Sequence, residues 1–405
     1  MKRKILPIAL LTMLALGFSA KASAQDIAID ETNFPDPGLR EYVQTVYDTN
    51  KDGVLSDEEN AAAKEMNVYF NTDPDRIISA RISGENVGYD MGNDIWPDEF
   101  PCSRISEHPL EGDGKRATYD YYAVSRYRWK CVINRKMTNW KGIELLTHLK
   151  SIYVGGKVSR KLTFSNMDTL VFFEIGGDDS AVESITIKNC PKLRYFTFTR
   201  TNHLKKVDLS KGNPELRYVL QYEYSDSISR EPQKARINLQ SFVIGKAPKL
   251  KYILMSKAPV KHFMIDYRSL RCLNEIWLYS GNKEQEIDLS RSKKLNHVTI
   301  NGKCGRLVLP DRGLTGACEY DRYGDEYYKE MIPFGPKDGP KILDLSKSTR
   351  ADDYADQYIF PELMRKLKKG NVRTKTLIVS RKMYDNRWNT LRLLRKKGIK
   401  IQIKG

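Results

Sequence analysis

A short apolar pattern, apolar-x-x-apolar-x-apolar, returns every ten to thirteen residues between about residues 149 and 309. Clear copies begin at Leu149, Leu170, Leu193, Leu204 and Leu295. A unit this short cannot bury its apolar side alone, so it must stack on its neighbours. The pattern therefore predicts an array of stacked repeats rather than one compact core.

The copies fall into two interleaved series. One series starts at Leu149, Leu170, Leu193, Leu216, Leu239 and Val260, and the other includes Val182, Leu204, Leu250, Leu273 and Leu295. Steps of 21 to 23 residues within the first series give a coil of about 22 residues that carries two extended segments. We predict an α/β repeat solenoid, built mostly of short β-strands, over residues 132–309.

The segments on either side of the repeats lack the regular apolar pattern. We expect an irregular insertion at 71–130, a loop at 310–341, and a final repeat with an α/β cap at 342–405. In the cap we expect a helix over 351–369, a strand at Thr376–Ser380, a helix lined by Trp388, Leu391 and Leu394, and a last strand from Ile399. Such an atypical end is what a stack of repeats needs to cover its exposed core.

A twelve-residue segment near the N-terminus has the order of calcium ligands found in an EF-hand loop. Gly53 allows the sharp turn, and Ser56 with Glu59 can also begin the following helix. We therefore predict a helix-loop-helix at 30–70 that binds one structural Ca²⁺; the alternative is an acidic surface turn. The predicted ligands are Asp48, Asn50, Asp52, Val54, Ser56 and Glu59.

Residues 1–24 have the features of a secretory signal peptide. Lys2, Arg3 and Lys4 precede an apolar run from Ile5 to Phe18, and Ala22-Ser23-Ala24 fits a cleavage site. No later stretch reaches 18 consecutive apolar residues, so we expect no membrane span. We predict an exported monomer that is secreted, periplasmic or held at the cell surface.

The six cysteines leave their pairing open. Export permits disulfides, and Cys102–Cys131 and Cys304–Cys318 are the most local pairs. The absence of a CxxC pair argues against a zinc site. Cys190 follows a repeat strand at the place where such repeats bury an Asn or Cys, so we expect a core thiol there.

The balance of charge limits the possible partners. The 405 residues carry a formal net charge of +17, and four of the basic residues lie in the predicted signal peptide, which leaves +13. That excess favours anionic partners. No nucleophile elbow, P-loop or HExxH helix is present in the sequence, so we expect a binding protein and not an enzyme.

Three short segments stand out beside the repeats. They are Asn33-Phe-Pro-Asp36 before the predicted calcium loop, Gly142-Ile-Glu144 at the entry to the repeats, and Leu377-Ile-Val-Ser380 with Tyr384 and Trp388 near the end. With these segments, the chain resembles exported bacterial leucine-rich-repeat proteins of the BspA-like and internalin-like kind. The insertion at 71–130 and Ser380, where a Pro is common, depart from that family. The resemblance implies adhesion or protein binding, without catalytic residues.

Strand alternation predicts where a protein partner binds. In each repeat the fourth and sixth places point inward, so the third place points outward. We predict that stacked coils align these places into an aromatic column beside a basic one, with the partner site at Phe172, Arg194, Tyr195, Arg217 and Tyr218. Two alternatives stay open: the side chains merely cover one another, or a basic face binds an anionic polymer such as a charged glycan or nucleic acid.

Overall fold

The computed structural model describes residues 26–70, 104–106, 120–122, 137–310 with short gaps, 318–320, 326–328, 334–347 and 355–405. The gaps are 157, 177–179, 200, 223–238, 267 and 296. The predicted signal peptide, Cys102, Cys131 and most of the 71–130 insertion lie outside the described residues.

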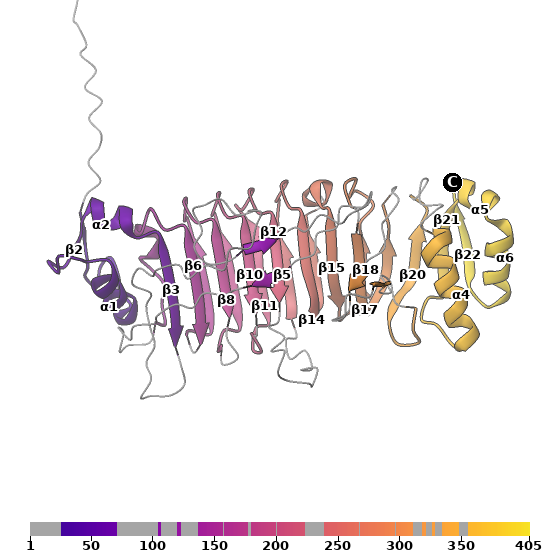
Figure 1. The fold of residues 1–405 in the computed structure, drawn as a ribbon, viewed down its shortest axis with the longest axis horizontal. Coiled ribbons are helices and arrows are strands. Elements are labelled where there is room, and N and C mark those ends of the chain that lie inside the picture. Colours follow the sequence, from indigo (N-terminus) through magenta and orange to yellow (C-terminus); the bar gives the residue numbers. More distant parts are fainter. Residues whose placement is uncertain are drawn as a thin grey trace, which may run out of the picture.

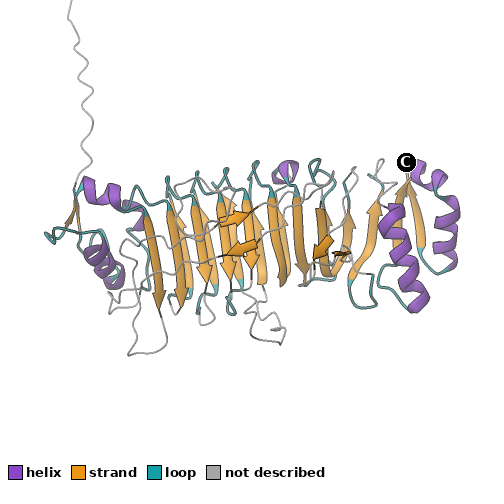
Figure 2. Cartoon of the chain, viewed as in Figure 1, coloured by secondary structure: helices purple, strands orange, loops and turns teal. Residues whose placement is uncertain are grey.

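Parallel strands dominate the described part of the chain, and helices lie at its two ends (Figures 1 and 2). The main sheet has sixteen strands there. Eleven follow one another in the order β3 (Glu65–Phe70), β6 (Ser151–Gly156), β8 (Phe172–Gly176), β10 (Tyr195–Thr199), β12 (Tyr218–Tyr222), β14 (Tyr252–Ile265), β15 (Glu275–Ser280), β17 (His297–Val308), β20 (Gly339–Leu345), β21 (Thr376–Ser380) and β22 (Lys400–Lys404). The other five are β7 (Lys161–Ser165), β9 (Ser184–Lys188), β11 (Lys206–Lys211), β13 (Leu239–Ile244) and β16 (Glu286–Asp288).

The two series of repeats form two parallel ladders, joined by two long strands. The first part of β14 pairs with β12 and β15, and its second part pairs with β13. In the same way β17 pairs first with β15, and then with β16 and β20. The chain thus passes from one ladder to the other within a single strand.

One detail of the predicted series is wrong. We expected Leu239 and Val260 to continue the series that contains Leu216. Instead Tyr218 pairs with Tyr252, so Leu250 is the next member after Leu216, while β13 continues the ladder of β9 and β11. From β13 onward, every later strand is therefore shifted by one place between the two series.

The predicted inward positions form the core. The apolar residues that open the repeats, such as Leu149, Leu193 and Leu250, are fully buried, and so are the fourth and sixth places, such as Phe173 and Ile175. A continuous apolar cluster runs from Phe34 in the N-terminal segment to Ile399 in the cap. Burial of one shared core across all coils stabilises units that could not fold singly.

Matching turns repeat along the stack. Asn166, Asn189 and Gly212 are each 23 residues apart, and each has a positive φ, of 58°, 53° and 72°. A Cβ on Gly212 would lie 2.6 Å from the Cα of Asn189, so close stacking of the turns requires glycine there. The Asn189 Nδ2 donates to Asn166 Oδ1 at 3.0 Å, which links neighbouring turns.

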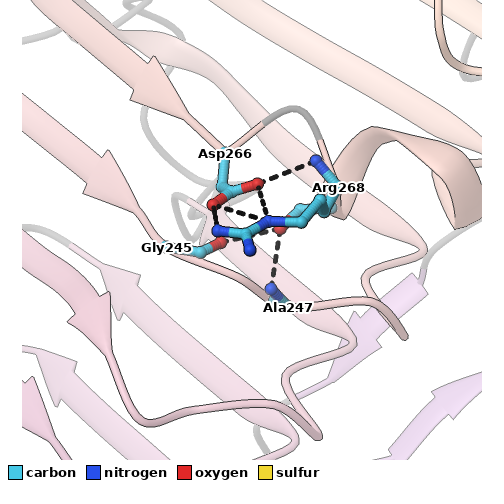
Figure 3. Close-up of polar contacts among 5 residues, drawn as sticks. Gly245, Ala247, Asp266 and Arg268 are labelled. Carbon is cyan, nitrogen blue, oxygen red and sulfur yellow. Dashed lines mark hydrogen bonds and ion pairs between the residues drawn. The ribbon is translucent and has the colours of Figure 1, made fainter.

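A buried serine fastens two later coils together (Figure 3). Ser269 lies in a 3₁₀ turn (Ser269–Cys272), and its Oγ donates to the Gly245 carbonyl at 2.7 Å while accepting from the Ala247 N–H at 2.7 Å. Beside it, hydrogen bonds from Arg268 lower the pKa of Asp266 to about 2. These contacts hold the start of one coil against the end of the previous one.

At the N-terminal end, α1 (Pro37–Val46) and α2 (Asp57–Ala62) flank the predicted calcium loop. Strand β1 (Ile27–Ala28) pairs antiparallel with β2 (Val54–Leu55) inside that loop. The sheet itself begins earlier than we predicted, because β3 pairs in parallel with β6 from Glu65 onward. The helix-loop-helix therefore runs directly into the first strand of the sheet.

At the C-terminal end, a π-helical turn (Ala355–Ile359) leads into α4 (Phe360–Lys369). Then follow β21, α5 (Arg381–Asn386), α6 (Trp388–Lys396) and β22. We predicted β21, α6 and the last strand but missed α5. In α6, Leu391 and Leu394 are buried as predicted, whereas Trp388 is 44% exposed.

Two smaller findings complete the fold. Within the predicted loop at 310–341, β18 (Cys318–Tyr320) pairs antiparallel with β19 (Glu326–Tyr328); a further antiparallel pair joins β4 (Arg104–Ser106) and β5 (Asp120–Tyr122). Cys190 and Cys304 are buried free thiols, so the Cys304–Cys318 pair is not formed. Among the described residues, no helix is long and apolar enough to cross a membrane.

Candidate functional site

One carboxylate connects the N-terminal helix to the entry of the repeats. Asp36 caps α1, because its Oδ1 accepts from the N–H groups of Gly38 and Leu39 at 2.9 Å each. Its Oδ2 accepts from the N–H and hydroxyl of Thr138 and from the N–H of Asn139, at 2.8–2.9 Å. Asp36 is 2% exposed, so five donors surround a buried charge. The helix-loop-helix is therefore held against residues far along the chain.

Two further contacts strengthen this attachment. Gly142 has a φ of 100°, and a Cβ on it would lie 2.2 Å from the carbonyl oxygen of Asn33. The Asn60 side chain donates to the Leu145 carbonyl at 3.0 Å. Two segments quoted for the family resemblance, at 33–36 and 142–144, thus lie against each other.

The loop between α1 and α2 is folded by its own carboxylates and amides. The Gly53 N–H donates to Asp48 Oδ2 at 3.0 Å, and Gly53 has a φ of 79°. The Asp52 N–H donates to Asn50 Oδ1 at 3.1 Å, and the Val54 N–H donates to Asp52 Oδ1 at 2.8 Å. These bonds bring the first three predicted ligands around one turn of the chain.

Asp48 has the chemical features that best fit a cation ligand in this loop. It is 4% exposed, and its Oδ1 is a buried atom without a hydrogen-bond partner. A buried carboxylate oxygen that lacks a partner carries a large desolvation cost, which a bound cation would offset.

Glu59 closes the loop from the first turn of α2. Its Oε1 accepts from the N–H and hydroxyl of Thr49 at 2.7 Å each, and its Oε2 accepts from the N–H and hydroxyl of Ser56 at 3.0 and 2.9 Å. Burial by itself would raise the pKa of Glu59, but these hydrogen bonds outweigh it and hold the pKa at about 2. Glu59 is therefore an anion at every physiological pH.

The six predicted ligands fit Ca²⁺ in part. Asp48, Asn50, Asp52, Val54, Ser56 and Glu59 lie in one short loop and offer oxygen only, which is the donor type that Ca²⁺ selects. Both carboxylate oxygens of Glu59 accept hydrogen bonds from Thr49 and Ser56, so the side chain would have to turn to coordinate the ion. The described residues contain no group of three or more His, Cys, Asp or Glu side chains already gathered around a common point.

The second candidate site is the predicted aromatic column. In the sheet, Phe172 lies beside Tyr195, Tyr195 beside Tyr218, and Tyr218 beside Tyr252. The rings of Tyr195 and Tyr218 stack with centroids 4.8 Å apart, and those of Tyr218 and Tyr252 with centroids 5.2 Å apart. The stacked column is therefore present, and Tyr252, which we had placed in the other series, extends it.

The column is not exposed as we expected. Phe172, Tyr195, Tyr218 and Tyr252 are only 2–9% exposed and form a second apolar cluster with Val171 and Leu220, separate from the main core. Because burial is the largest influence, the pKa of Tyr195 is raised, although Arg194 and Arg217 lower it in part. Strand alternation predicted that these rings lie on the face away from the main core, but it could not predict their burial.

The basic row beside the column is more accessible. Arg194 and Arg217 are half-buried, and each has a buried Nε without a hydrogen-bond partner. The Arg217 guanidinium lies 3.7 Å from Glu215, whose pKa is lowered first by its hydrogen bond from Lys249 and further by both arginines. Exposed Lys251 continues the row next to Tyr252.

Comparisons of the chain with protein-family models, with curated proteins and with solved structures found no match.

Proposed function

We propose that this protein is an exported repeat solenoid of the leucine-rich-repeat kind whose function is to bind a protein partner. The observation that carries the proposal is the register of the parallel ladders, which sets equivalent residues of successive coils beside one another. Such a stack offers a long surface with one row of side chains per coil, which suits binding rather than catalysis.

The partner site that we propose is centred on Phe172, Arg194, Tyr195, Arg217 and Tyr218. The rings are buried, so their part is to support the arginine row rather than to touch the partner first. Arginine beside stacked aromatic rings is a combination enriched at the centres of protein interfaces. Arg194 and Arg217 are only half-buried, so the exposed part of each side chain can form charge-assisted hydrogen bonds with a partner's carboxylate groups.

A pull-down tests this proposal without disturbing the stacked rings. The purified protein is used to capture proteins from extracellular material, and the parent is compared with Arg194→Gln plus Arg217→Gln. Lys283→Gln plus Lys294→Gln removes the same charge from exposed positions outside the proposed site and serves as the control. We expect the arginine variant to lose the captured partner and the control to retain it. Equal capture by both variants would place the site elsewhere.

The second candidate function is binding of an anionic polymer, favoured by the net charge of +13 that remains without residues 1–24. Salt distinguishes the two functions. Binding to a polyanion falls steeply between low and physiological salt, because bound counterions must be released, whereas binding through buried anchors responds less. The same pull-down at two salt concentrations therefore separates them.

We further propose that the loop at 48–59 binds one Ca²⁺ per chain. The partnerless Oδ1 of Asp48 supports this most directly, together with the oxygen-only donor set. When bound, the ion would supply positive charge at the centre of the loop. Asp48, Asn50, Asp52 and Glu59 would hold it by side chains, Val54 by its carbonyl, and Ser56 through water. The role is structural, since Asp36 and Gly142 tie this loop to the first coils.

A further inference from the structure

The positive charge of the chain is concentrated at one end. Residues 360–405 contain fifteen Lys and Arg against two acidic residues, a net charge of +13. Residues 26–70 contain eleven acidic residues against three basic ones, a net charge of −8. These two segments lie at opposite ends of the row of strands (Figure 1). The molecule therefore has a basic end at α4–β22 and an acidic end at α1–α2.

The basic side chains of the last helix face solvent. Arg392, Arg395, Lys396 and Lys397 are exposed, and none of them forms an ion pair with another described residue. Lys400 and Lys404 are exposed on β22, which among the described strands pairs with β21 alone and so stands at the end of the strand order. Unpaired charge held this close together repels itself, and an anionic surface would relieve that repulsion.

Apolar side chains are exposed on the same end. Of four large apolar side chains that are exposed in the described residues, three lie here: Leu393 (52%), Trp388 (44%) and Ile403 (38%). In α6 the buried Leu391 and Leu394 mark the inner face. At 100° per residue, Leu393 then lies on the outer face between Lys396 and Lys397, and Trp388 lies at the opposite edge of that face beside Arg392. The Trp388 ring also contacts Tyr384 edge-on, at 5.3 Å between centroids.

We propose that this end, α6 with β22, docks on the surface of a bilayer that contains anionic lipid. Lys and Arg interleaved with Trp and Leu on one helix face is the composition of helices that lie at lipid–water interfaces. A soluble glycan or nucleic acid would satisfy the charges but would leave Leu393 and Ile403 in water. A second copy of the same basic end is repelled. The acidic end, −8, is also repelled by an anionic bilayer, so the row of strands projects away from it.

Vesicle co-sedimentation tests the docking. The purified protein is mixed with vesicles of phosphatidylglycerol and phosphatidylcholine, or of phosphatidylcholine alone, at low salt. We expect binding only to the anionic vesicles. Lys396→Gln plus Lys397→Gln should weaken binding about 25-fold, at about fivefold per charge near the surface. Trp388→Ala plus Leu393→Ser should weaken it about tenfold or more, because apolar contact is lost.

The control variant is Lys192→Gln plus Lys294→Gln, which removes two charges away from this end and should bind like the parent. Every variant keeps the parent's N-terminus, so binding through residues 1–24 would persist in all of them. Two results would overturn the proposal. One is that the apolar variant binds like the parent while sulfated dextran competes fully, which indicates a soluble polyanion. The other is salt-sensitive self-association without vesicle binding, which indicates that the basic end meets the acidic end of a second copy.

Discussion

At the scale of single residues, Asp36 makes more stabilising contacts than its place in the sequence suggests. In the sequence, Asp36 stands before Pro37 and the helical apolar spacing of Leu39 and Val43, which indicates a helix cap and nothing more. Its second oxygen accepts three further bonds from Thr138 and Asn139. No local pattern could reveal these, because the donors lie about a hundred residues away.

Asp36→Ala should loosen α1 strongly. The change removes a helix cap and leaves buried donors unpaired, a loss of about 2–3 kcal/mol. We expect amide hydrogen exchange within Pro37–Val46 to accelerate about 30- to 150-fold, while exchange in β10 and β12 stays constant. Asp26→Asn, at an exposed position, should leave all rates unchanged. Unaltered protection of α1 in Asp36→Ala would show that the helix is held by other contacts.

Glu59 gives the N-terminal segment a defined acid sensitivity. Its pKa is about 2 in the folded chain against 4.5 ordinarily, so the unfolded state binds the proton more readily. The stability that the carboxylate contributes is complete above about pH 4.5 and is lost as the pH falls toward 2. Thermal unfolding is monitored by hydrogen exchange in α2 at a series of pH values. We expect the parent to show this loss of stability and Glu59→Gln not to show it. Parallel pH curves for the two proteins would contradict the assignment.

At the scale of elements, strand alternation predicted most of the sheet, because burial on one face imposes a period of two on the sequence. The strands at Thr376–Ser380 and from Ile399, and the stacked rings of Tyr195 and Tyr218, follow from that period. No such period marks the exchange of the two series between β12 and β13, so that exchange was missed. The short α5 was missed because Arg381–Asn386 shows little apolar periodicity.

Because the aromatic column is buried, its rings matter for stability. Tyr218→Ala should destabilise the coils around β12 by about 3 kcal/mol or more, since a buried ring and two stacked neighbours are lost. Urea unfolding monitored by tyrosine fluorescence is the measurement. Tyr384→Ala, at a half-buried ring in the cap, is the comparison and should cost less. A loss below about 1 kcal/mol would mean that the rings are free to move out of the column.

Asn213 is a buried polar side chain that, like the rings of the aromatic column, links neighbouring coils. It is 3% exposed, its Oδ1 accepts from the Cys190 N–H at 3.3 Å, and its Nδ2 donates to the Ile187 carbonyl at 3.0 Å. Asn213→Ala leaves both backbone groups buried and unpaired, so we expect a loss of about 2–3 kcal/mol. Asn389→Ala, on the exposed side of α6, should be near neutral in the same urea unfolding experiment. Equal midpoints for the two variants would refute this account of the turns.

At the scale of the whole molecule, the sequence predicts a long stack of coils but not how its ends differ. Composition gives only the net charge of the chain. The fold places the acidic segment and the basic segment at opposite ends of the stack. The proposal of a calcium loop rests on spacing that the sequence alone displays, because all six proposed ligand positions lie within twelve residues. Its attachment to the first coils, through Asp36, Asn60 and Gly142, needed the structure.

The central claim, that the loop at 48–59 is a calcium site at the front of the stack, is tested most directly by calorimetric titration with Ca²⁺. We predict one ion per chain with a dissociation constant of about 10⁻⁴ to 10⁻³ M, as for extracellular EF-hand modules. Glu59→Ala, which removes the closing ligand, should abolish the heat of binding, and Glu31→Ala, at an exposed acidic residue outside the loop, should preserve it. The absence of calcium heat in the parent, or equal heat in parent and Glu59→Ala, would contradict the claim.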